Sequence, residues 1–379
     1  MTRLVIVRQK YNPAGGAERF VSRALSALSA QGDLDVNLIA RKWESLSGVR
    51  AIAANPFYLG SVWRDWGFAC AARRIWQREG FELVQSHERI AGCDIYRAGD
   101  GVHRHWLQLR RRVLSRWGRI ALQLNPYHHY VQWMERRMFL HPRLKTVICN
   151  SQMVKREIQH YFGLPDARFA VIYNGVDTAA FHPSLREHRA AMRAQWQIPP
   201  AAPLLLYVGS GFERKGVARA LQAIVPHPEV QLLIVGKDKH AAQYQRLAAT
   251  LGIASRVRFA GAQNDVKPFY GMADAFILPT LYDPFPNVCV EALACGLPVF
   301  TTQQCGAAEL IRDGDNGWVA DALDGATLRQ QLGQWLASRA EWPSLAAAAR
   351  ASTEPLTLTA MAANMIDVYR PLLARRDGA

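Results

Sequence analysis

Short runs of apolar residues recur along the chain and alternate with segments in which apolar residues have helical spacing. Residues 4–7 ("LVIV") form the first run, and the segment after it predicts a helix with an apolar face from Phe20 to Leu28. A second run lies at residues 36–40. Further buried strands are predicted around Val147, Val171, Leu204, Val230, Val257 and Ala275. Because strands covered on both faces are continuously apolar, the pattern predicts an α/β protein with parallel sheets.

This alternation is long enough for two α/β domains. We expect the first domain at residues 1–178 and the second at residues 179–355. The hinge is expected just after "YNGVD" (residues 173–177), where residues 182–203 predict a solvated helix and a Pro/Ala linker. Open parallel sheets bind ligands beyond the carboxyl ends of their strands, so two sheets facing each other would form a cleft lined by those loops.

Composition restricts the class of protein. The 379 residues are 50% hydrophobic and 20% charged, which is typical of a globular protein. No run approaches the ~20 apolar residues of a membrane span, and the N-terminal apolar run is too short for a signal peptide. Six scattered cysteines without CxxC spacing indicate reduced thiols, so we expect a cytoplasmic protein. The net charge of +15 favours anionic partners: phosphorylated ligands, nucleic acid or an anionic membrane.

Two groups of residues at strand ends could bind phosphate. Gly15 and Gly16 lie between the first strand and its helix, where glycines let the backbone approach an anion, although a plain turn also explains them. Arg214 and Lys215 follow the strand at Leu204 and could bind a diphosphate. Arg214 could donate two parallel hydrogen bonds, and Lys215 could act as a point charge. The alternative is a solvated basic pair.

Two carboxylates stand eight positions apart in "YDPFPNVCVEALACGLP". Asp283 lies on a predicted loop after a strand and could accept hydrogen bonds from sugar hydroxyls, whereas Glu291 lies in the following helix and could bind a ribose. The alternative is that Asp283 is a turn or cap residue and that Glu291 is a surface residue of the helix. "DLD" (residues 33–35) precedes the second strand and so lies at the sheet edge opposite the expected site. The histidines at residues 103–105 and 128–129 have no acidic or Cys partners nearby at ligand spacing, so neither group predicts a metal site.

Taken together, the chain resembles the retaining glycosyltransferases of family 4, whose GT-B fold has two Rossmann-like domains with parallel sheets facing across a cleft. The resemblance rests on the family's E-x7-E element, here Asp283 and Glu291, on "YNGVD", and on "GAAELIRDGDNGWV" (residues 306–319). Within the family, "GSGFERKGV", "FAGAQNDVKPFYGMADAFILPT" and "CDIYRAGDGVH" are similar to the lipopolysaccharide core glucosyltransferase group. The resemblance also implies that a helix at about residues 356–376 packs back on the first domain.

The resemblance assigns roles to the donor-side residues. Gly15 and Gly16 would contact the donor phosphate, and Arg214 and Lys215 would bind the diphosphate and stabilise the leaving group. Glu291 would hold the ribose. These residues imply a nucleotide sugar as co-substrate, with no metal and no other cofactor.

The remaining roles concern the transferred sugar, the base and the acceptor. Asp283 would bind the sugar's hydroxyls, the loop of residues 263–266 with Val266 would meet the base, and Asp100 would orient or deprotonate the acceptor hydroxyl. The sequence departs from the family in having Asp at position 283 and "PFPNV" (residues 284–288) where many members have "GFGLP". Pro removes a backbone donor there, which the Asn287 side chain could replace beside Val288.

The function implied is transfer of a hexose, glucose from UDP-glucose, to a lipopolysaccharide core or related glycolipid with retention of configuration. No carboxylate is assigned as a covalent nucleophile, so front-face attack is the working hypothesis. The alternatives are a nucleotide-sugar epimerase or hydrolase of the same fold, and a nucleic-acid-binding protein, for which no recognised module is present.

The segment from His103 to Phe139 is rich in arginine and tryptophan. Apolar residues recur at helical spacing from Trp106 to Leu124, and arginines fill much of the rest. Such an amphipathic helix suits the surface of an anionic membrane and would stand beside Asp100, where a lipid-linked acceptor enters. We therefore expect peripheral membrane association, the alternative being a helix packed on its own domain.

Overall fold

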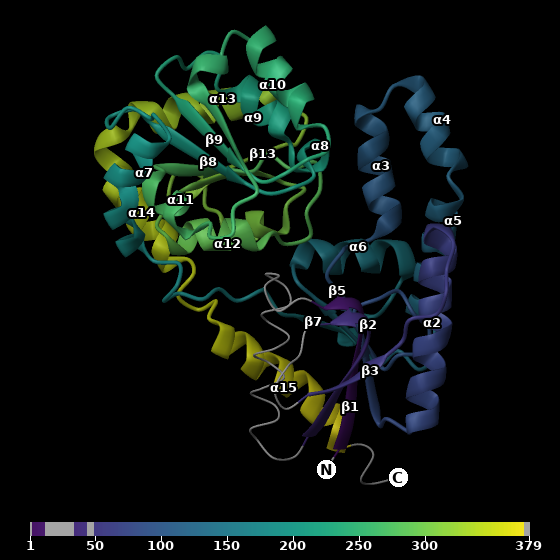
Figure 1. Ribbon diagram of the computed structural model, residues 1–379. Coiled ribbons are helices and arrows are strands. Elements are labelled where there is room, and N and C mark those ends of the chain that lie inside the picture. Colours follow the sequence, from purple (N-terminus) through teal and green to yellow (C-terminus); the bar gives the residue numbers. More distant parts are fainter. Residues whose placement is uncertain (1, 12–33, 44–48, 375–379) are drawn as a thin grey trace. The chain divides into compact units, whose positions relative to one another are not determined.

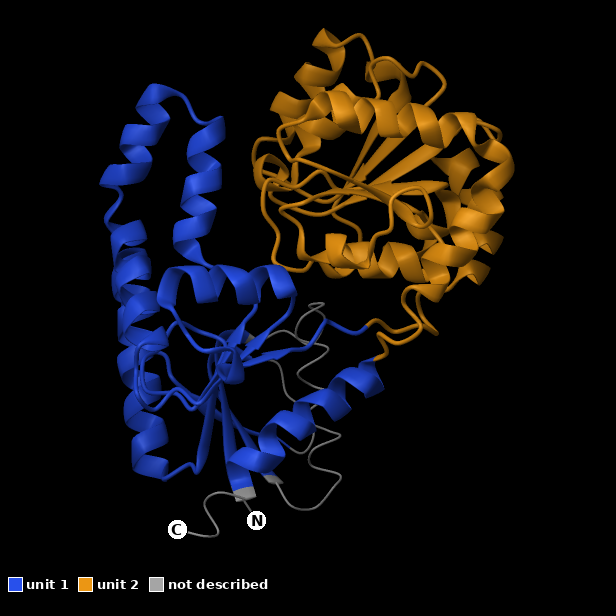
Figure 2. Cartoon of the chain, turned by 180° about the vertical axis from the view of Figure 1, so that it is seen from behind, with its two compact units in different colours: residues 1–175, 358–379 blue, residues 176–357 orange. Residues whose placement is uncertain are grey.

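The computed structural model describes residues 2–11, 34–43 and 49–374 of the chain. It comprises two compact units, one formed by residues 1–175 and 358–379 and the other by residues 176–357 (Figures 1 and 2). Each unit contains one parallel sheet. Gly15, Gly16, Asp33 and the helix expected from Phe20 to Leu28 lie outside the described residues.

Unit 1 is built on a seven-stranded sheet with the order β3-β2-β1-β4-β5-β6-β7, in which all neighbours are parallel. Its strands are β1 (Thr2–Tyr11), β2 (Leu34–Trp43), β3 (Arg50–Ala53), β4 (Leu83–Ser86), β5 (Ile95–Ala98), β6 (Thr146–Cys149) and β7 (Phe169–Val171). The predicted runs at residues 4–7 and 36–40 are only the buried middles of β1 and β2. Both strands continue in register to Tyr11 and Trp43, so their polar carboxyl ends remain ordered.

Helices cover both faces of this sheet. They are α2 (Gly60–Glu79), α3 (His103–Val113), α4 (Arg116–Leu124), α5 (Pro126–Phe139), α6 (Gln152–Phe162) and α15 (Leu358–Ala374), with a 3-10 turn η1 (Asp166–Arg168). Successive strand residues point to opposite faces, so Val5 and Val7 pack with α2, α5 and α6, whereas Leu4 and Ile6 pack with α15. Figure 1 shows α2 and α15 on opposite sides of the strands.

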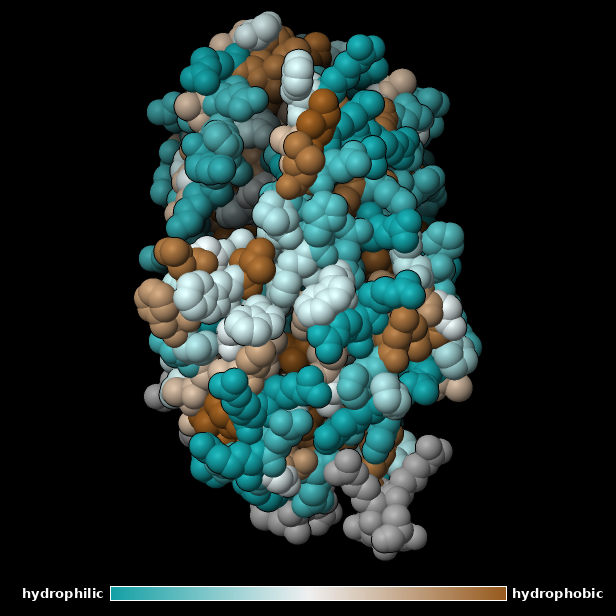
Figure 3. Space-filling model, turned by 90° about the vertical axis from the view of Figure 1, so that its right-hand side faces the viewer, coloured by the Kyte–Doolittle hydropathy of each residue, from teal (hydrophilic) through white to brown (hydrophobic). Residues whose placement is uncertain are grey.

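The segment from His103 to Phe139 forms three helices, which corrects the expectation of one amphipathic helix. Ser115 leaves the helical conformation and caps α4 by accepting a hydrogen bond from the backbone N–H of Gly118. Asn125 precedes Pro126, which disfavours helical geometry, and it caps α5. Arginines and apolar residues nevertheless remain exposed on α4, where Trp117 is 81% and Leu124 is 73% exposed. Figure 3 looks onto this side of unit 1 and shows hydrophobic side chains among hydrophilic ones.

Unit 2 has a six-stranded parallel sheet with the order β10-β9-β8-β11-β12-β13. Its strands are β8 (Leu204–Val208), β9 (Gln231–Val235), β10 (Val257–Gly261), β11 (Ala275–Ile277), β12 (Val299–Thr302) and β13 (Gly317–Ala320). Its α-helices are α7 (Arg189–Gln195), α8 (Phe212–Lys215), α9 (Val217–Ala223), α10 (Ala241–Thr250), α11 (Lys267–Met272), α12 (Asn287–Ala294), α13 (Gly325–Ala337) and α14 (Trp342–Ala351). Its 3-10 helices are η2 (Pro183–His188), η3 (Ala254–Arg256), η4 (Gly306–Leu310) and η5 (Arg339–Glu341).

Residues 182–203 contain the expected helix, α7, and most of them are exposed or half-buried, but Arg193 is an exception. Arg193 of α7 is buried, and its guanidinium donates to Asp274 Oδ2 at 2.7 Å and to the carbonyls of Met272 and Pro200. The charged residues that indicated a solvated helix are therefore partly internal, because a buried arginine is tolerated when its donors and charge are both compensated. This segment is an integral part of unit 2.

No helix in the described ranges is both long enough and apolar enough to cross a bilayer.

Two helical glycines of unit 2 should respond oppositely to alanine. At Gly271 in α11, an added Cβ would lie 1.9 Å from the carbonyl oxygen of Leu185, so Gly271→Ala should destabilise the protein by about 1–3 kcal/mol. At Gly333 in α13, the nearest atom would be 3.5 Å away on His227, so Gly333→Ala should stabilise it by about 0.5–1 kcal/mol. Thermal unfolding midpoints measure both, and a shift of the two variants in the same direction would contradict the packing described.

Candidate active site

The carboxyl edge of the sheet in unit 2 is held together by closely packed loops. Gly216 has φ +82°, and a Cβ there would lie 2.0 Å from the carbonyl oxygen of Pro279. A Cβ at Gly236, which follows β9, would lie 2.1 Å from the carbonyl oxygen of Gly209, which follows β8. Only glycine allows these approaches, so the loops after β8, β9 and β11 are fixed against one another.

Arg214 and Lys215 meet Asp283 at this edge. Arg214 Nη1 donates to Asp283 Oδ2 at 3.1 Å and to the carbonyl of Tyr282 at 2.7 Å, and Lys215 Nζ lies 3.6 Å from the same Oδ2. Asp283 is 7% exposed, whereas the Arg214 side chain is 37% exposed. One buried carboxylate thus orients two cations, one of which reaches solvent. Both cations contact Asp283 through Oδ2.

The backbone holds the three residues in place. Leu281 donates its N–H to the carbonyl of Arg214 at 2.7 Å, and the Thr280 hydroxyl donates to the same oxygen at 3.0 Å. Asp283 forms an isolated bridge with Cys305. The short helix α8 is therefore tied to the loop after β11, which explains why residues almost 70 positions apart share one ion-pair cluster.

Glu291 lies in α12 beside a tyrosine that sequence reasoning missed. The Tyr270 hydroxyl donates to Glu291 Oε2 at 2.9 Å and contacts the carbonyl of Val288 at 3.4 Å. Burial and then the neighbouring Glu291 raise the pKa of Tyr270 well above its ordinary value, so the hydroxyl stays protonated and keeps donating. Pro286 precedes α12, whose first two residues are Asn287 and Val288, so both predicted residues stand at a helix N-terminus.

The remaining donor-side predictions lie in the same unit or outside the described residues. Val266 is half-buried and precedes α11, and Gln263 is exposed with its side-chain amide donating to the carbonyl of Ala260. Gly15 and Gly16 are not described. The base-binding role of Val266 stays a prediction.

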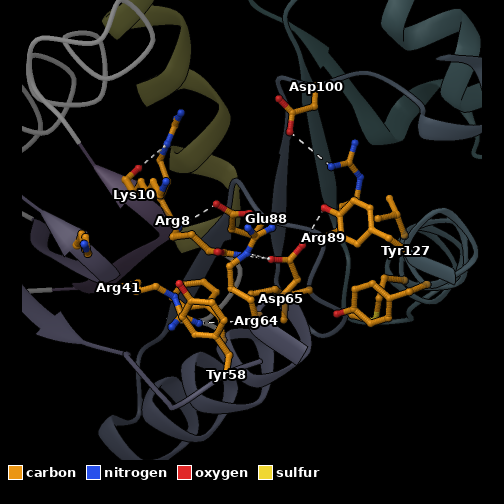
Figure 4. Close-up of a pocket in the computed structure, with 17 residues that line it drawn as sticks. Arg8, Lys10, Arg41, Tyr58, Arg64, Asp65, Glu88, Arg89, Asp100 and Tyr127 are labelled. Atoms are coloured by element: carbon orange, nitrogen blue, oxygen red, sulfur yellow. Dashed lines mark hydrogen bonds and ion pairs between the residues drawn. The ribbon is translucent and has the colours of Figure 1, made fainter. Parts of the chain in front are cut away.

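In unit 1, Asp100 lines a pocket of about 440 Å³ at the carboxyl edge of the sheet (Figure 4). The Asp100 side chain is 73% exposed and lies 3.4 Å from Arg89 Nη1. Arg89 in turn donates through Nε to the buried Glu135 at 2.8 Å. The predicted acceptor-side carboxylate is therefore held by an arginine that a second, internal carboxylate orients.

The same pocket contains further polar groups on its α2 and α5 walls. Asp65 of α2 accepts hydrogen bonds from Arg64, Gln9 and the Tyr127 hydroxyl. Burial alone would raise the pKa of Asp65, but these donors hold it below its ordinary value. Glu88 accepts from the backbone N–H of Gln9 at 2.9 Å, and burial raises its pKa.

Sequence reasoning missed the basic residues of this pocket. Arg8 and Lys10 belong to β1, and Arg41 and Lys42 to β2, in the polar ends that extend past the apolar runs. Glu88 follows β4, a strand that the apolar pattern did not predict. Extending each predicted parallel strand by two or three residues at its carboxyl end would have placed these residues at the binding edge.

The candidate metal ligands are engaged elsewhere. Among the described residues, no group of three or more His, Cys, Asp or Glu side chains is arranged to hold a metal ion. Asp35 lies 3.7 Å from Arg3, and His103 Nε2 contacts His128 Nδ1 at 3.0 Å.

Comparison with known proteins gives matches over both units. The family model of glycosyltransferase family 4 matches residues 14–180, and that of glycosyl transferases group 1 matches residues 188–352. Over 318 residues the chain is 27% identical to lipopolysaccharide glucosyltransferase WaaG from Escherichia coli (strain K12), covering 82% of this chain and 83% of the relative. Over 148 residues it is 34% identical to lipopolysaccharide core biosynthesis glycosyltransferase LpsE from Rhizobium meliloti (strain 1021), covering 39% and 44% of the two chains.

Solved structures show the same fold. The crystal structure of WaaG, a glycosyltransferase involved in lipopolysaccharide biosynthesis, superposes with a TM-score of 0.82 at 25% identity and covers 96% of this chain and 99% of that one. The two parallel α/β units, the two family models and this superposition together establish that the chain belongs to the family 4 glycosyltransferases of the GT-B fold.

Proposed function

We propose that the chain transfers a hexose, glucose from UDP-glucose, to a lipopolysaccharide core or related glycolipid. The observation that carries this proposal is the cluster of Arg214 and Lys215 on Asp283 at the carboxyl edge of a family 4 sheet. The choice of glucose and of a lipopolysaccharide acceptor rests on the similarity to the WaaG glucosyltransferase.

In unit 2, each residue of the cluster has a distinct role toward the nucleotide sugar. Arg214 and Lys215 bind the diphosphate, and Asp283 Oδ1 accepts a hydrogen bond from a hydroxyl of the transferred sugar. Glu291 accepts the ribose hydroxyls, and Tyr270 fixes its orientation by donating to Oε2. Val266, Asn287 and Val288 complete the donor site.

The bond that breaks joins the anomeric carbon to a diphosphate oxygen, and the bond that forms joins this carbon to the acceptor oxygen on the same face. The electron pair of the broken bond goes to the diphosphate, where Arg214 and Lys215 stabilise it without a divalent metal. The acceptor proton passes to the departing phosphate oxygen, and the configuration is retained. Asp100 orients the acceptor hydroxyl from unit 1.

A lipid-linked acceptor requires access to a membrane, and α4 supplies the surface. Trp117, Ile120 and Leu124 of α4 are exposed, and the exposed Arg116 and Arg119 immediately precede Trp117 and Ile120. Exposed apolar residues interspersed with arginine suit the interface of an anionic membrane. We propose peripheral association through this helix.

Removing the Lys215 ammonium should slow the chemistry. Lys215→Met should lower kcat for sugar transfer by about 100-fold or more, because a fixed cation opposite developing charge is lost. The matched control is Arg246→Met, an exposed residue of α10, which should retain full turnover. Unchanged kcat in Lys215→Met would overturn the assignment of the diphosphate site, and release of free UDP without any acceptor would favour the hydrolase alternative.

The product should retain the anomeric configuration of the donor. Proton NMR of the purified product from UDP-glucose is expected to show an α-linked glucose, and a chelator of divalent cations should leave the rate unchanged because the positive charge comes from side chains. A β-linked product would exclude front-face transfer, and a rate restored only by added divalent ions would exclude the metal-independent proposal.

Replacing exposed apolar residues of α4 should weaken membrane binding. Trp117→Ser with Leu124→Ser should reduce partition onto phosphatidylglycerol liposomes by about 10-fold or more in a flotation assay, because two side chains leave the apolar interface. The control is Val225→Ser with Leu323→Ser, two exposed apolar residues of unit 2. Equal flotation of the wild type and both double variants on phosphatidylglycerol liposomes would refute the role of α4. Flotation of the wild type on phosphatidylcholine liposomes equal to that on phosphatidylglycerol liposomes would also refute it.

A further inference from the structure

Large apolar side chains are exposed on the side of unit 1 that α2 and α5 form. Phe57 and Leu59, just before α2, are 78% and 75% exposed. Exposed tryptophans follow on both helices, and Figure 3 looks onto this side of the unit. We call the set the aromatic surface, and its residues are Phe57, Leu59, Trp63, Trp66, Trp133 and Leu140. Large apolar residues that are exposed in one place indicate an interaction surface.

The α2 residues of this surface lie next to one another. Leu59, Trp63 and Trp66 recur at i, i+4 and i+7, which places them on one face of the helix. The Phe57 ring contacts the Trp63 ring edge-on, with the ring centroids 5.7 Å apart. The opposite face of α2 packs on the core of unit 1, and its buried residues include Phe68, Ala72 and Trp76. The aromatic face is therefore not needed for the packing of α2 on its own unit.

A small groove joins this face of α2 to the exposed apolar residues of α5. The groove has a volume of about 70 Å³, and its lining includes Trp66 and Cys70 of α2 and Trp133 and Arg137 of α5. Leu140 directly follows α5 and stands seven positions after Trp133, so the two side chains lie on the same side of that helix. The aromatic surface is therefore continuous over both helices.

The charges of α2 and α5 are predominantly positive. Each carboxylate of these helices is paired with at least one arginine, and the pairs include Asp65 with Arg64, Glu79 with Arg78 and Glu135 with Arg89. Four further arginines of the two helices form no ion pair with a carboxylate within the described ranges. They are Arg73, Arg74, Arg136 and Arg137. The Arg137 guanidinium lies 4.6 Å from the centre of the Trp133 ring, so one cation is held directly on the aromatic surface.

This combination suits an anionic membrane better than a second copy of the chain. Tryptophan has an apolar body and a polar N–H edge, which suits the boundary between lipid headgroups and acyl chains. Arginines beside it bind the phosphates of anionic lipids at the same depth. A two-fold dimer, by contrast, places the same patch of both copies together, and the arginines of one copy would then repel those of the other.

We propose that the aromatic surface is a membrane contact in addition to α4. Its apolar side chains enter the interface of an anionic bilayer, and the arginines of α2 and α5 bind lipid phosphates. The same two helices form walls of the pocket that Asp100 lines, through Arg64 and Tyr130 among others. The contact therefore holds the acceptor pocket at the bilayer surface. The inference rests on the proposed function, because a lipid-linked acceptor gives this placement its purpose.

Protection of a native thiol tests the contact directly. Cys70 lines the groove and is half-buried, whereas the other five cysteines are buried, so a membrane-impermeant maleimide should alkylate Cys70 first in the folded protein. Phosphatidylglycerol vesicles should slow this alkylation about 5-fold or more, because lipid covers the groove, whereas phosphatidylcholine vesicles should leave it unchanged. Cys70→Ala shows how much of the labelling comes from Cys70. An unchanged rate for protein that has bound to phosphatidylglycerol vesicles would overturn the proposal.

Substitution of apolar residues tests the aromatic surface while α4 is intact. Phe57→Ser with Leu59→Ser changes two side chains that are mostly exposed, so the variant should keep the thermal unfolding midpoint of the wild type. It should lower partition onto phosphatidylglycerol vesicles about 10-fold or more, because two side chains leave the apolar interface. The matched control is Val225→Ser with Leu323→Ser in unit 2, which should float like the wild type.

A second variant removes charge instead of apolar area. Arg74→Gln with Arg136→Gln changes two exposed arginines of α2 and α5 and should lower partition onto phosphatidylglycerol vesicles about 10-fold, because two cations near the lipid phosphates are lost. Arg246→Gln with Arg339→Gln, two exposed arginines of unit 2, is its control. Flotation of both aromatic-surface variants equal to that of the wild type would overturn the proposal, whichever result α4 gives.

Two further measurements distinguish other occupants and failure of the proposed function. Self-association of the wild type in sedimentation without vesicles, lost in Phe57→Ser with Leu59→Ser, would identify a second copy of the chain as the occupant and overturn the membrane contact. Sugar transfer to a lipid-free acceptor is measured separately on the wild type. If no transfer occurs but the vesicle results are as expected, the proposed function fails and the contact stands. If transfer occurs and the vesicle results fail, the contact fails and the proposed function stands.

Discussion

The cluster at the carboxyl edge of the sheet in unit 2 depends on one buried carboxylate that binds two cations. Asp283 is almost fully buried, so its charge would be costly without Arg214 and Lys215. Because the carboxylate is present before any ligand, the two cations are already oriented. Under the proposed function they would meet the diphosphate in this orientation, and Asp283 would remain their counter-charge after the product leaves. The same contact would then serve both preorganisation and turnover.

Backbone geometry makes this contact possible. Residues separated by almost 70 positions meet because the loops after β8 and β11 touch, with Gly216 packed against the carbonyl of Pro279. In a sheet with the order β10-β9-β8-β11-β12-β13, β8 and β11 are adjacent although β9 and β10 lie between them in the chain. Their loops therefore meet at one edge, and the proposed donor site lies where the strand order changes direction.

The apolar pattern predicted strands that are largely apolar, including β6, β8, β9 and β11. It missed β4 and β12, which contain buried polar residues. In β4, Gln85 accepts a hydrogen bond from Tyr369, and in β12 the hydroxyls of Thr301 and Thr302 donate to the carbonyls of Leu278 and Thr280. These partners come from distant parts of the chain, so the burial of the polar side chains depends on tertiary structure that local periodicity does not contain.

The site was predictable to the extent that it is local in sequence. Arg214, Lys215, Asp283 and Glu291 stand out at strand ends or in the E-x7-E spacing, although the role of each residue stays a prediction. Tyr270 was not predictable, because its hydroxyl contacts Glu291 across 21 positions. The two units also treat cations differently. In unit 2 the cationic pair has a carboxylate of its own, whereas the partners that the described residues give Arg41 in unit 1 are neutral oxygens and aromatic rings.

This carboxylate has a consequence for ligand binding in unit 2. A cation that already has a carboxylate gains less from an incoming anion, because the ligand competes with or adds to an existing counter-charge. Under the proposed function, the nucleotide sugar therefore needs its base, ribose and hexose contacts as well as the diphosphate to bind. Selectivity for the donor would then reside in the contacts around Glu291 and Tyr270.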